Sequence, residues 1–413
     1  MCLAGYSVTP LPLGERVAEG LVRGAPRQKR PLTPAPSPSV GRGENSAPLN
    51  TYYGRGSIEA MNATSHIPRL SPREALAALR GADLMDLARQ ADAAARRLHP
   101  EPWRTWAIDR NINFTNVCRA GCRFCAFWRR EGDPEAYVLS REAVEAKVRE
   151  AVLLGATHIL AQGGLHDGLG LGWYEGLLAH LKSRFKILLH CFSPPEVWHL
   201  SEREGLPVET VLARLRAAGL DSLPGGGAEI LVDRVRGIAS PKKCTAGQWL
   251  QVMRAAHRLG MRTTATMVFG HVETPEERIE HLVRLRDLQD ETGGFLSFIA
   301  WPFQARNTEL LRGRRLGPSW RPTSGSEYLR MVAVARLFLD NIPNVQASYV
   351  TMGTRIGQVA LCFGANDIGS TMIEENVVSA AGCVHSSSPA ELQRLIREAG
   401  FVARQRDSRY ELV

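Results

Sequence analysis

Short apolar runs alternate with longer amphipathic segments through most of the chain. The runs typical of buried strands are Ala107–Asn116, Thr157–Gln162, Lys186–Phe192, Asp221–Leu223, Arg262–Phe269, Phe295–Phe303, Asn344–Val350 and Asn366–Gly369. Apolar residues recur at helical spacing in Arg141–Leu154, Gly172–Arg184, Val208–Ala218, Ala246–Leu259, Pro275–Thr292, Gly325–Leu339, Arg355–Phe363 and Ser388–Ala399. Strands that alternate with helices build a parallel sheet. We therefore predict an α/β fold, a (β/α)8 barrel over residues 106–388. Because the last strand pattern is weak, an incomplete barrel of about six units is the alternative.

The first part of the chain does not have the pattern of a folded domain. Within residues 1–65, the stretch Pro31–Glu44 is rich in Pro, Ser and Gly and has no apolar period. Such a segment cannot bury enough surface to offset the loss of chain entropy on folding. We expect residues 1–65 to be a disordered or non-native leader.

Two smaller segments flank the predicted barrel. Residues 66–105 predict a helical N-terminal extension, in which Ser71 is the N-cap and Glu74 completes a capping box. Residues 389–413 predict a C-terminal helix and edge strands, because Phe401–Val413 alternates like an edge hairpin.

Composition and charge narrow the class of protein. The chain has 413 residues, 44% of them hydrophobic, which suffices for one large barrel with extensions. No apolar run reaches the about 18 residues of a transmembrane helix, so we expect no membrane segment. The net charge of +9 comes from basic residues scattered on helices such as Arg278–Arg286. This distribution favours solvated faces and an anionic electron-donor protein over a nucleic-acid partner.

Three cysteines follow the first predicted strand at C-x3-C-x2-C spacing: Cys118, Cys122 and Cys125. Zinc sites usually have four ligands, but no fourth Cys or His lies nearby, and the next histidine is His158. A [4Fe–4S] cluster held by three thiolates leaves one iron open to a small molecule. A zinc knuckle completed from a distant part of the chain and three reduced core cysteines are the alternatives.

The remaining cysteines indicate a reducing compartment. They are isolated from one another along the chain: Cys2, Cys191, Cys244, Cys362 and Cys383. The start of the chain lacks the charged and apolar regions of a signal peptide. Because an iron–sulfur cluster of this kind is oxygen-sensitive, we expect a cytoplasmic protein.

The predicted strand ends carry further candidate residues, since a barrel has its active site at the carboxyl ends of its strands. After the second strand, Gln162-Gly163-Gly164 forms a turn whose backbone a ligand amine can approach, or an ordinary strand–helix turn. After the third strand, Ser193 is either a hydrogen-bonding group for a ribose or substrate, or the N-cap of a helix that starts with proline.

Three more loops contain unusual polar residues. The glycines of Pro224–Glu229 suggest a ligand close to the backbone, and Glu229 and Arg234 are candidate contacts or an ordinary helix start. His271 follows the fifth strand and is a candidate acid, base or substrate ligand, although a lone histidine is more often a satisfied core residue. The stretch Phe363–Asn376 is polar for a barrel mouth, and buried polar groups need partners.

These motifs together resemble the radical S-adenosylmethionine (SAM) superfamily. Within it they resemble the enzymes of the futalosine route to menaquinone and their deazaflavin-synthase relatives. The stretches that carry the resemblance are NFTNVCRAGCRFCAFWR, LDSLPGGGAEILVDRVRGIASPKKCTAGQWL, RTTATMVFGHVETPEERIEHL, DNIPNVQASYVTMG and FGANDIGSTMIEENVVSAAG. They are distributed over roughly residues 106–382, most of the chain.

The resemblance implies two cofactors and a set of residues that hold them. A [4Fe–4S] cluster on the three clustered cysteines and SAM on its open iron are expected. The SAM-binding residues that it implies are Phe124, Phe127, Gln162, Gly163, Gly164, Ser193, Glu229 and Arg234. The implied acid–base residues are His271 and Glu229, and the implied substrate contacts are His271, Asn366, Asp367 and Glu374.

The resemblance also implies a reaction. A 5′-deoxyadenosyl radical would take hydrogen from the ribose of a small futalosine-derived substrate, and an intramolecular carbon–carbon bond would follow. The reductant would be a flavodoxin or ferredoxin. The adenosylating and deazaflavin-type members of the branch are the alternatives. A non-catalytic iron–sulfur carrier and a zinc-binding nucleic-acid protein are the competing classes, and a carrier would need no barrel of this size.

Overall fold

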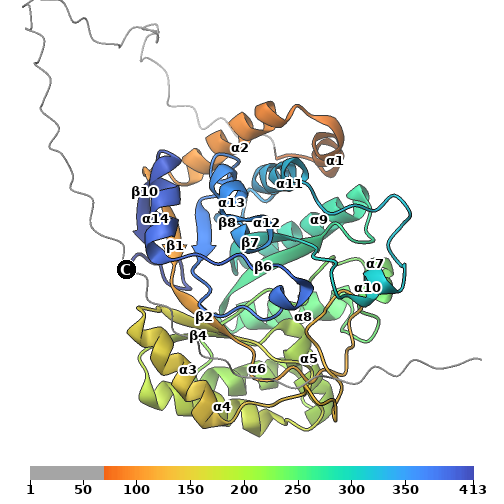
Figure 1. The fold of residues 1–413 in the computed structure, drawn as a ribbon, viewed down its shortest axis with the longest axis vertical. Coiled ribbons are helices and arrows are strands. Elements are labelled where there is room, and N and C mark those ends of the chain that lie inside the picture. Colours follow the sequence, from red (N-terminus) through yellow and green to blue (C-terminus); the bar gives the residue numbers. More distant parts are fainter. Residues whose placement is uncertain (1–68) are drawn as a thin grey trace, which may run out of the picture. The chain divides into compact units, whose positions relative to one another are not determined.

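A single sheet of parallel strands forms the centre of the protein (Figure 1). The structure is a computed structural model that describes residues 69–413, so the predicted leader lies outside the described residues. The strands are β1 Trp103–Ala107, β2 Asp109–Ile112, β3 His158–Ala161, β4 Leu188–Cys191, β5 Ser222–Leu223, β6 Arg262–Phe269, β7 Phe295–Pro302, β8 Asn344–Gln346, β9 Asp367–Ser370 and β10 Val402–Gln405.

The sheet curls into the predicted barrel because β1 and β2, the two halves of its first strand, pair with different neighbours. The strand order is β10-β1-β9-β8-β7-β6-β5-β4-β3-β2, and every pairing is parallel. Only Ile108 separates β1 from β2, yet β1 pairs with β9 and β2 pairs with β3. The two halves of this strand therefore bring the two ends of the sheet together.

Helices surround the sheet in the predicted alternation. They are α1 Pro72–Gly81, α2 Leu84–Leu98, α3 Arg141–Leu153, α4 Leu171–Arg184, α5 Pro194–Glu204, α6 Val208–Ala217, α7 Asp233–Ala239, α8 Ala246–Arg258, α9 Pro275–Thr292, α10 Glu309–Arg312, α11 Gly325–Phe338, α12 Tyr349–Met352, α13 Thr354–Ala360 and α14 Pro389–Glu398, with a 3-10 turn at Ser379–Ala381. The sequence interpretation offered α5 and α7 only as alternatives, as a helix that starts with proline after Ser193 and a helix start near Arg234, and it missed the four-residue helices α10 and α12.

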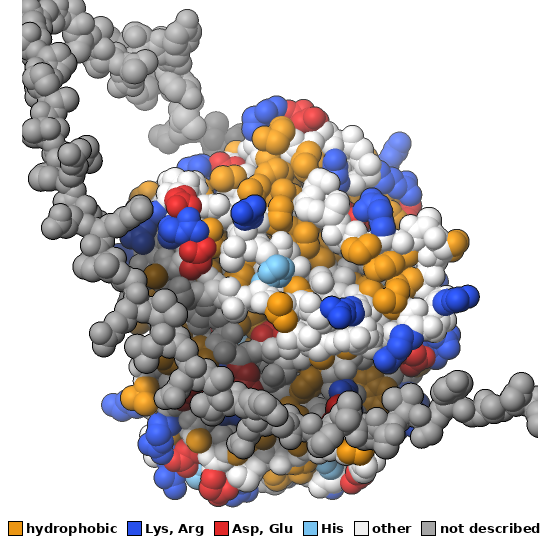
Figure 2. Space-filling model, in the orientation of Figure 1, with side chains coloured by type: hydrophobic (Ala, Val, Ile, Leu, Met, Phe, Trp, Pro, Cys, Tyr) orange, Lys and Arg blue, Asp and Glu red, His pale blue; other side chains and the backbone are white. Residues whose placement is uncertain are grey.

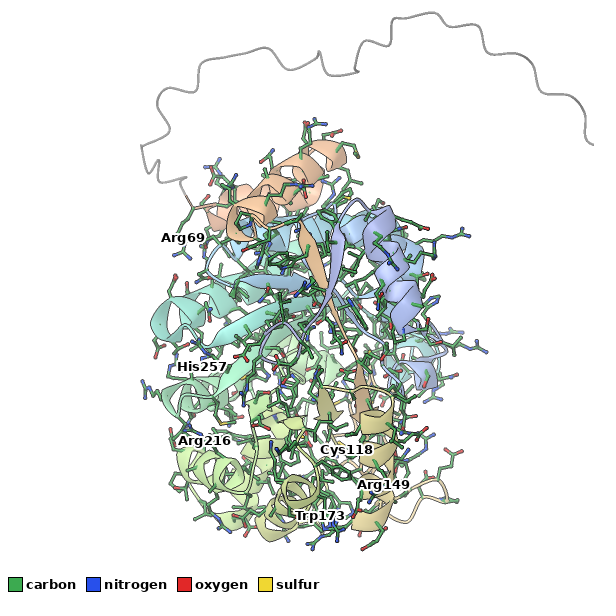
Figure 3. All side chains as sticks on the ribbon, turned by 90° about the vertical axis from the view of Figure 1, so that its left-hand side faces the viewer. Arg69, Cys118, Arg149, Trp173, Arg216 and His257 are labelled. Carbon is green, nitrogen blue, oxygen red and sulfur yellow. The ribbon has the colours of Figure 1, made fainter. Side chains whose placement is uncertain are left out.

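The N-terminal extension is two helices, α1 and α2. The predicted capping box of Ser71 and Glu74 is present at the start of α1. The chain turns after α1 because Asp83 caps a second helix, its side chain accepting hydrogen bonds from two backbone N–H groups of α2. α2 packs against α11. Figure 3 shows Arg69 where the described chain begins, and its guanidinium is 2.8 Å from both Asp290 and Asp340.

The C-terminal tail joins the barrel. β10 lies parallel to β1, and the hairpin-like part of the tail is limited to an antiparallel bridge between Arg406 and Leu412. The buried Arg406 guanidinium pairs with Asp367 at the start of β9, where Nε lies 2.6 Å from Oδ2. Thr105 donates a hydrogen bond to the same carboxylate. The tail therefore packs into the end of the barrel opposite to the carboxyl ends of its strands.

The surface mixes charges of both signs. On the face that Figure 2 shows, Lys and Arg side chains are dispersed among acidic and uncharged ones. Over the residues the structure describes, no helix combines the length and the apolarity that crossing a membrane requires.

Candidate active site

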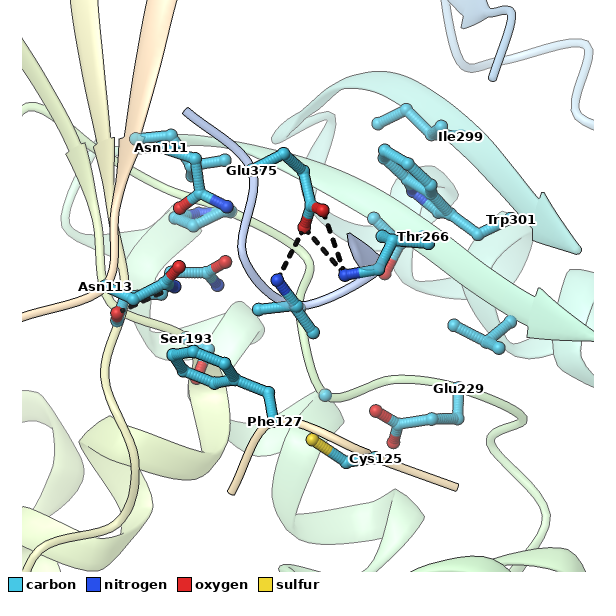
Figure 4. A pocket seen from close by; sticks show the side chains of 18 of the residues that line it. Asn111, Asn113, Cys125, Phe127, Ser193, Glu229, Thr266, Ile299, Trp301 and Glu375 are labelled. Atoms are coloured by element: carbon cyan, nitrogen blue, oxygen red, sulfur yellow. Dashed lines mark hydrogen bonds between the residues drawn. The ribbon is translucent and has the colours of Figure 1, made fainter. Parts of the chain in front are cut away.

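A cavity of about 400 Å³ opens within the barrel and extends to the carboxyl ends of its strands. Side chains from opposite sides of the barrel point into it (Figure 4). Among the predicted site residues, those that line it are Cys118, Cys122, Phe124, Cys125, Phe127, Gln162, Gly163, Gly164, Ser193 and Glu229. The cysteine loop, the glycine turn and the loop after β5 therefore meet in one place.

The three cysteines lie in the loop that follows β2. All three line the cavity; Cys122 is buried, and the backbone N–H of Leu165 donates to Cys118 Sγ at 3.3 Å. Burial raises the pKa of Cys122 to about 12 and raises that of Cys125, so a bound cation is needed to hold them as thiolates. Within residues 69–413 no group of three His, Cys, Asp or Glu side chains forms a single-ion site. Three thiols around one chamber, with a backbone N–H on one sulfur, fit an iron–sulfur cluster.

The glycine turn after β3 packs directly on the cysteine loop. A Cβ atom on Gly164 would collide with the Val117 carbonyl and lie 2.8 Å from Cys118 Cβ. Glycine is therefore required here by the contact with the loop, a different reason from the ligand approach that the sequence suggested. The turn is oriented by Glu196, whose Oε1 accepts a hydrogen bond from Gly163 N at 3.0 Å.

Glu196 is a buried acid that the sequence interpretation missed. It is 2% exposed and lines the cavity. Its Oε2 lies 2.6 Å from Ser193 Oγ, and Ser193 makes no side-chain cap to α5. Burial raises the pKa of Glu196 to about 8, so the group is largely neutral at pH 7. The Ser-x-x-Glu spacing was the available signal, but it also describes a helix start.

Glu229 faces the cysteines together with a lysine that was not predicted. Lys243 Nζ lies 3.1 Å from Glu229 Oε1 and 5.2 Å from the centre of the Phe124 ring. Burial alone lowers the pKa of Lys243, but its neighbours Cys122 and Glu229 raise it above its usual range. The preceding glycines are required by protein packing, because a Cβ on Gly225 would lie 2.5 Å from the Thr264 carbonyl oxygen.

The predicted residues Arg234 and His271 lie outside the cavity lining. Arg234 is half exposed and pairs with Glu277 at 2.6 Å, so the structure does not place it among the cavity-lining residues, and its contact with SAM stays a prediction. His271 has a fully buried side chain, with Nε2 3.0 Å from the Val268 carbonyl and Nδ1 3.3 Å from Glu273. The chain turns after β6 and directs the imidazole into the protein, so a catalytic or substrate-binding His271 has no support from its position and stays a prediction.

The predicted substrate contacts near the end of the chain also lie outside the cavity lining. Asn366 and Asp367 lie at the start of β9, far from its carboxyl end, and neither lines the cavity. Asn366 binds Arg336, whereas Asp367 binds Arg406. Glu374 pairs with Arg110 at 2.8 Å and Lys147 at 2.7 Å outside the cavity. Their polarity is explained by these buried or half-buried partners.

Glu375, the neighbour of Glu374, lines the cavity instead. Its carboxylate accepts hydrogen bonds from the backbone N–H groups of residues 377–379 and so closes the turn that follows. Further polar lining residues that the sequence interpretation missed are Asp109, Asn111, Asn113, His158, His190, Thr264, Thr266, Gln304, Gln346 and Ser370. Many of them lie on strands, and the sequence interpretation treated these strands only as buried segments.

Family models match most of the described chain. The model of the radical SAM superfamily matches residues 112–285, and that of the CofH/MqnC C-terminal region matches residues 292–413. The barrel and its cysteine loop define a radical SAM enzyme, and members of that superfamily bind a [4Fe–4S] cluster and SAM. Within this class, the chain belongs to the family of the cyclic dehypoxanthine futalosine synthases and their 4-hydroxyphenyl transferase relatives.

Named relatives are similar over nearly their whole length. A "Cyclic dehypoxanthine futalosine synthase" of Halalkalibacterium halodurans is 46% identical over 84% of this chain and 92% of its own. One of Streptomyces coelicolor is 43% identical over 83% and 85%. A "5-amino-6-(D-ribitylamino)uracil--L-tyrosine 4-hydroxyphenyl transferase" of Methanothermobacter thermautotrophicus is 41% identical over 79% and 87%.

Solved structures of low sequence identity share the fold. Methylornithine synthase (PylB) superimposes with a TM-score of 0.64 at 15% identity, over 81% of this chain and 94% of its own. The FeFe-hydrogenase maturase HydG from Carboxydothermus hydrogenoformans gives 0.65 at 16% identity, over 83% and 77%. These likenesses support the barrel architecture.

Proposed function

We infer that the protein converts dehypoxanthine futalosine to cyclic dehypoxanthinyl futalosine, a step in menaquinone biosynthesis. The observation that carries this function is the 46% and 43% identity to two synthases of that name over more than four fifths of the chain. A cavity of about 400 Å³ lies within the size range of small-molecule binding sites.

The proposed cofactor residues are those that line the cavity near the cysteine loop. Cys118, Cys122 and Cys125 would hold the cluster, and the turn at Gly163 and Gly164 would border SAM. When bound, the reduced cluster and SAM supply a 5′-deoxyadenosyl radical that can take hydrogen from the substrate ribose. We assign no cofactor contact to Arg234.

The protein's own groups would orient the reactants and exclude water. Glu229 already accepts from Lys243 and lies 3.5 Å from Arg236, so we propose that it positions the lysine beside the cysteines. Trp301 and Ile299 from β7 form an apolar wall of the same cavity, opposite Phe127 in the view of Figure 4. Such a wall keeps hydrogen donors away from a carbon radical.

The reductant and compartment follow from the cofactor chemistry. We propose that a flavodoxin or ferredoxin delivers the electron, because scattered basic side chains favour an acidic donor protein. The seven cysteines within residues 69–413 form no disulfide, which agrees with a reducing cytoplasm.

The test is anaerobic incubation of the reconstituted enzyme with reductant, SAM and dehypoxanthine futalosine, followed by mass analysis. The expected product has the substrate mass less two hydrogens, and free deoxyadenosine accumulates. A product joined to the adenosyl group would contradict cyclisation.

A 4-hydroxyphenyl transferase is the second candidate, because relatives of that name are 41% and 42% identical to this chain. The same assay, with tyrosine and 5-amino-6-(D-ribitylamino)uracil as substrates, separates the two. Turnover of this pair and none of dehypoxanthine futalosine would favour the transferase.

A further inference from the structure

A layer of uncharged side chains, two of them polar, crosses the barrel below the cysteine loop. Asn111 on β2 is in register with Leu160 on β3, which is in register with His190 on β4. All three line the cavity. Residues in register on neighbouring parallel strands face the same side, so these side chains point inward together. With strands about 4.8 Å apart, the Cα atoms of Asn111 and His190 are separated by about 10 Å.

The side-chain amide oxygen of Asn111 is an unsatisfied hydrogen-bond acceptor. The residue is 5% exposed, and its Oδ1 atom is buried with no partner among the described residues. A buried acceptor without a partner costs about 1–3 kcal/mol. Asn113, two residues further along, is satisfied by contrast, because its Nδ2 donates to the Gln162 carbonyl and Asn376 donates to its Oδ1. The Asn111 amide is therefore the group in this layer that a ligand would satisfy.

His190 presents a second neutral group to the same cavity. Its Nδ1 lies 2.7 Å from Ser222 Oγ on β5, and within residues 69–413 Nε2 has no hydrogen-bonding partner. Burial lowers the pKa of His190 to about 3, so the ring is uncharged at pH 7. Depending on the tautomer, Nε2 donates or accepts a hydrogen bond. A hydroxyl group can pair with either form, whereas a carboxylate can only accept and therefore pairs only with the donating form.

The charges near this layer are already paired. Asp109 accepts a hydrogen bond from Ser370 at 2.6 Å and lies 3.4 Å from His158. The two cationic side chains that line the cavity, Lys243 and Arg406, pair with Glu229 and Asp367. A carboxylate would need an unpaired cation or several N–H donors. An uncharged polyhydroxyl group fits this layer better.

We propose that Asn111 and His190 bind hydroxyl groups of the sugar portion of the substrate, with Ser222 positioning the His190 ring. This inference rests on the proposed function, which supplies a substrate with a sugar. In the view of Figure 4, Asn111 lies across the cavity from Cys125. Asn111 would therefore bind a sugar in the cavity on the side of the sugar that faces away from the cysteine loop.

The test measures binding rather than turnover. Dissociation constants would be determined anaerobically by calorimetry on cluster-loaded enzyme with SAM, for dehypoxanthine futalosine, an analogue without sugar hydroxyls, and benzoate. N111L and H190F are each expected to raise the dissociation constant of the intact substrate at least about tenfold. They should raise that of the analogue less than about threefold. H190Q, which keeps a donor and an acceptor, should restore much of the loss. L160V is the matched control in the same layer and should affect both ligands alike.

The outcomes separate this inference from the proposed function. Iron content and SAM affinity must be unchanged in the variants, and the unmodified enzyme must prefer the intact substrate over the analogue. The sugar assignment would be overturned if the variants lost equal affinity for substrate and analogue, or lost affinity for neither. A matching loss of affinity for benzoate would also overturn it. If the unmodified enzyme does not bind dehypoxanthine futalosine, the proposed function fails, and the sugar assignment fails with it.

Discussion

Replacing Glu196 by Gln should change how stability depends on pH. In the folded protein, burial raises the pKa of Glu196 from 4.5 to about 8, against the opposing hydrogen bonds from Ser193 and Gly163. In the unfolded chain the group ionises near 4.5, so between these values unfolding releases a proton. The free energy of unfolding of the unmodified protein should therefore fall, relative to E196Q, by about 1.4 kcal/mol per pH unit.

The size of the effect follows from the pH window. The whole interval from 4.5 to about 8 corresponds to about 5 kcal/mol, and the practical range from about pH 5.5 to 8 corresponds to about 3 kcal/mol. Gln keeps the shape and an acceptor for Gly163 N–H, so SAM affinity at pH 7 should change less than about threefold. E196A leaves that N–H without its acceptor and should weaken SAM binding more.

The assay is anaerobic denaturation of both proteins from about pH 5.5 to 8.5. Subtracting the two curves removes the pH dependence of every shared group. E202Q, at an exposed position on the same helix α5, is the matched control and should give a flat difference. Parallel curves for the unmodified protein and E196Q would refute the assignment of a buried, largely neutral acid.

The remaining predictions concern the cluster, the buried charges and two predicted site residues that lie outside the cavity lining. C118A should lose most of the bound iron, whereas C362A, at an exposed position, should retain it; equal iron in both would contradict the cysteine assignment. R406A leaves Asp367 buried without its cation and should lower the free energy of unfolding by about 3–5 kcal/mol in denaturant titrations. R234A should leave the SAM dissociation constant within about twofold, because the side chain is half exposed and its pair with Glu277 contributes about 1 kcal/mol at most. H271N should still release deoxyadenosine from SAM, and loss of that product with folding intact would restore a catalytic role.

The fold was predictable because its signals are local. All eight predicted strands are present, and capping residues such as Ser71 mark helix starts that the structure confirms. Elements that depend on tertiary context were missed. Trp103–Ala107 was not recognised as the first half of a strand that closes the sheet, and α7 is too short to show a helical period.

The position of a candidate site residue could be predicted where the direction of its strand determines it. It could not be predicted where a contact with a distant segment determines it. The cysteine loop and the glycine turn follow strands, so their place at the barrel mouth could be inferred. Asn366 and Asp367 begin a strand, and that direction assigns them to the opposite end. Arg234 is bound by Glu277 on another helix, a contact between distant segments that no local pattern reveals. The inward polar residues Asn111 and His190 resembled ordinary strand positions, because a sequence does not say which face of a strand lines a cavity.

The central claim is cyclisation of the substrate's own ribose onto its aromatic ring, and isotope transfer tests it most directly. The unmodified enzyme would be incubated anaerobically with reductant, SAM and dehypoxanthine futalosine deuterated at ribose C4′. We predict one deuterium in the released deoxyadenosine and a cyclised product that has lost that deuterium and one further hydrogen. Deoxyadenosine without deuterium, or an adenosylated product, would contradict the account.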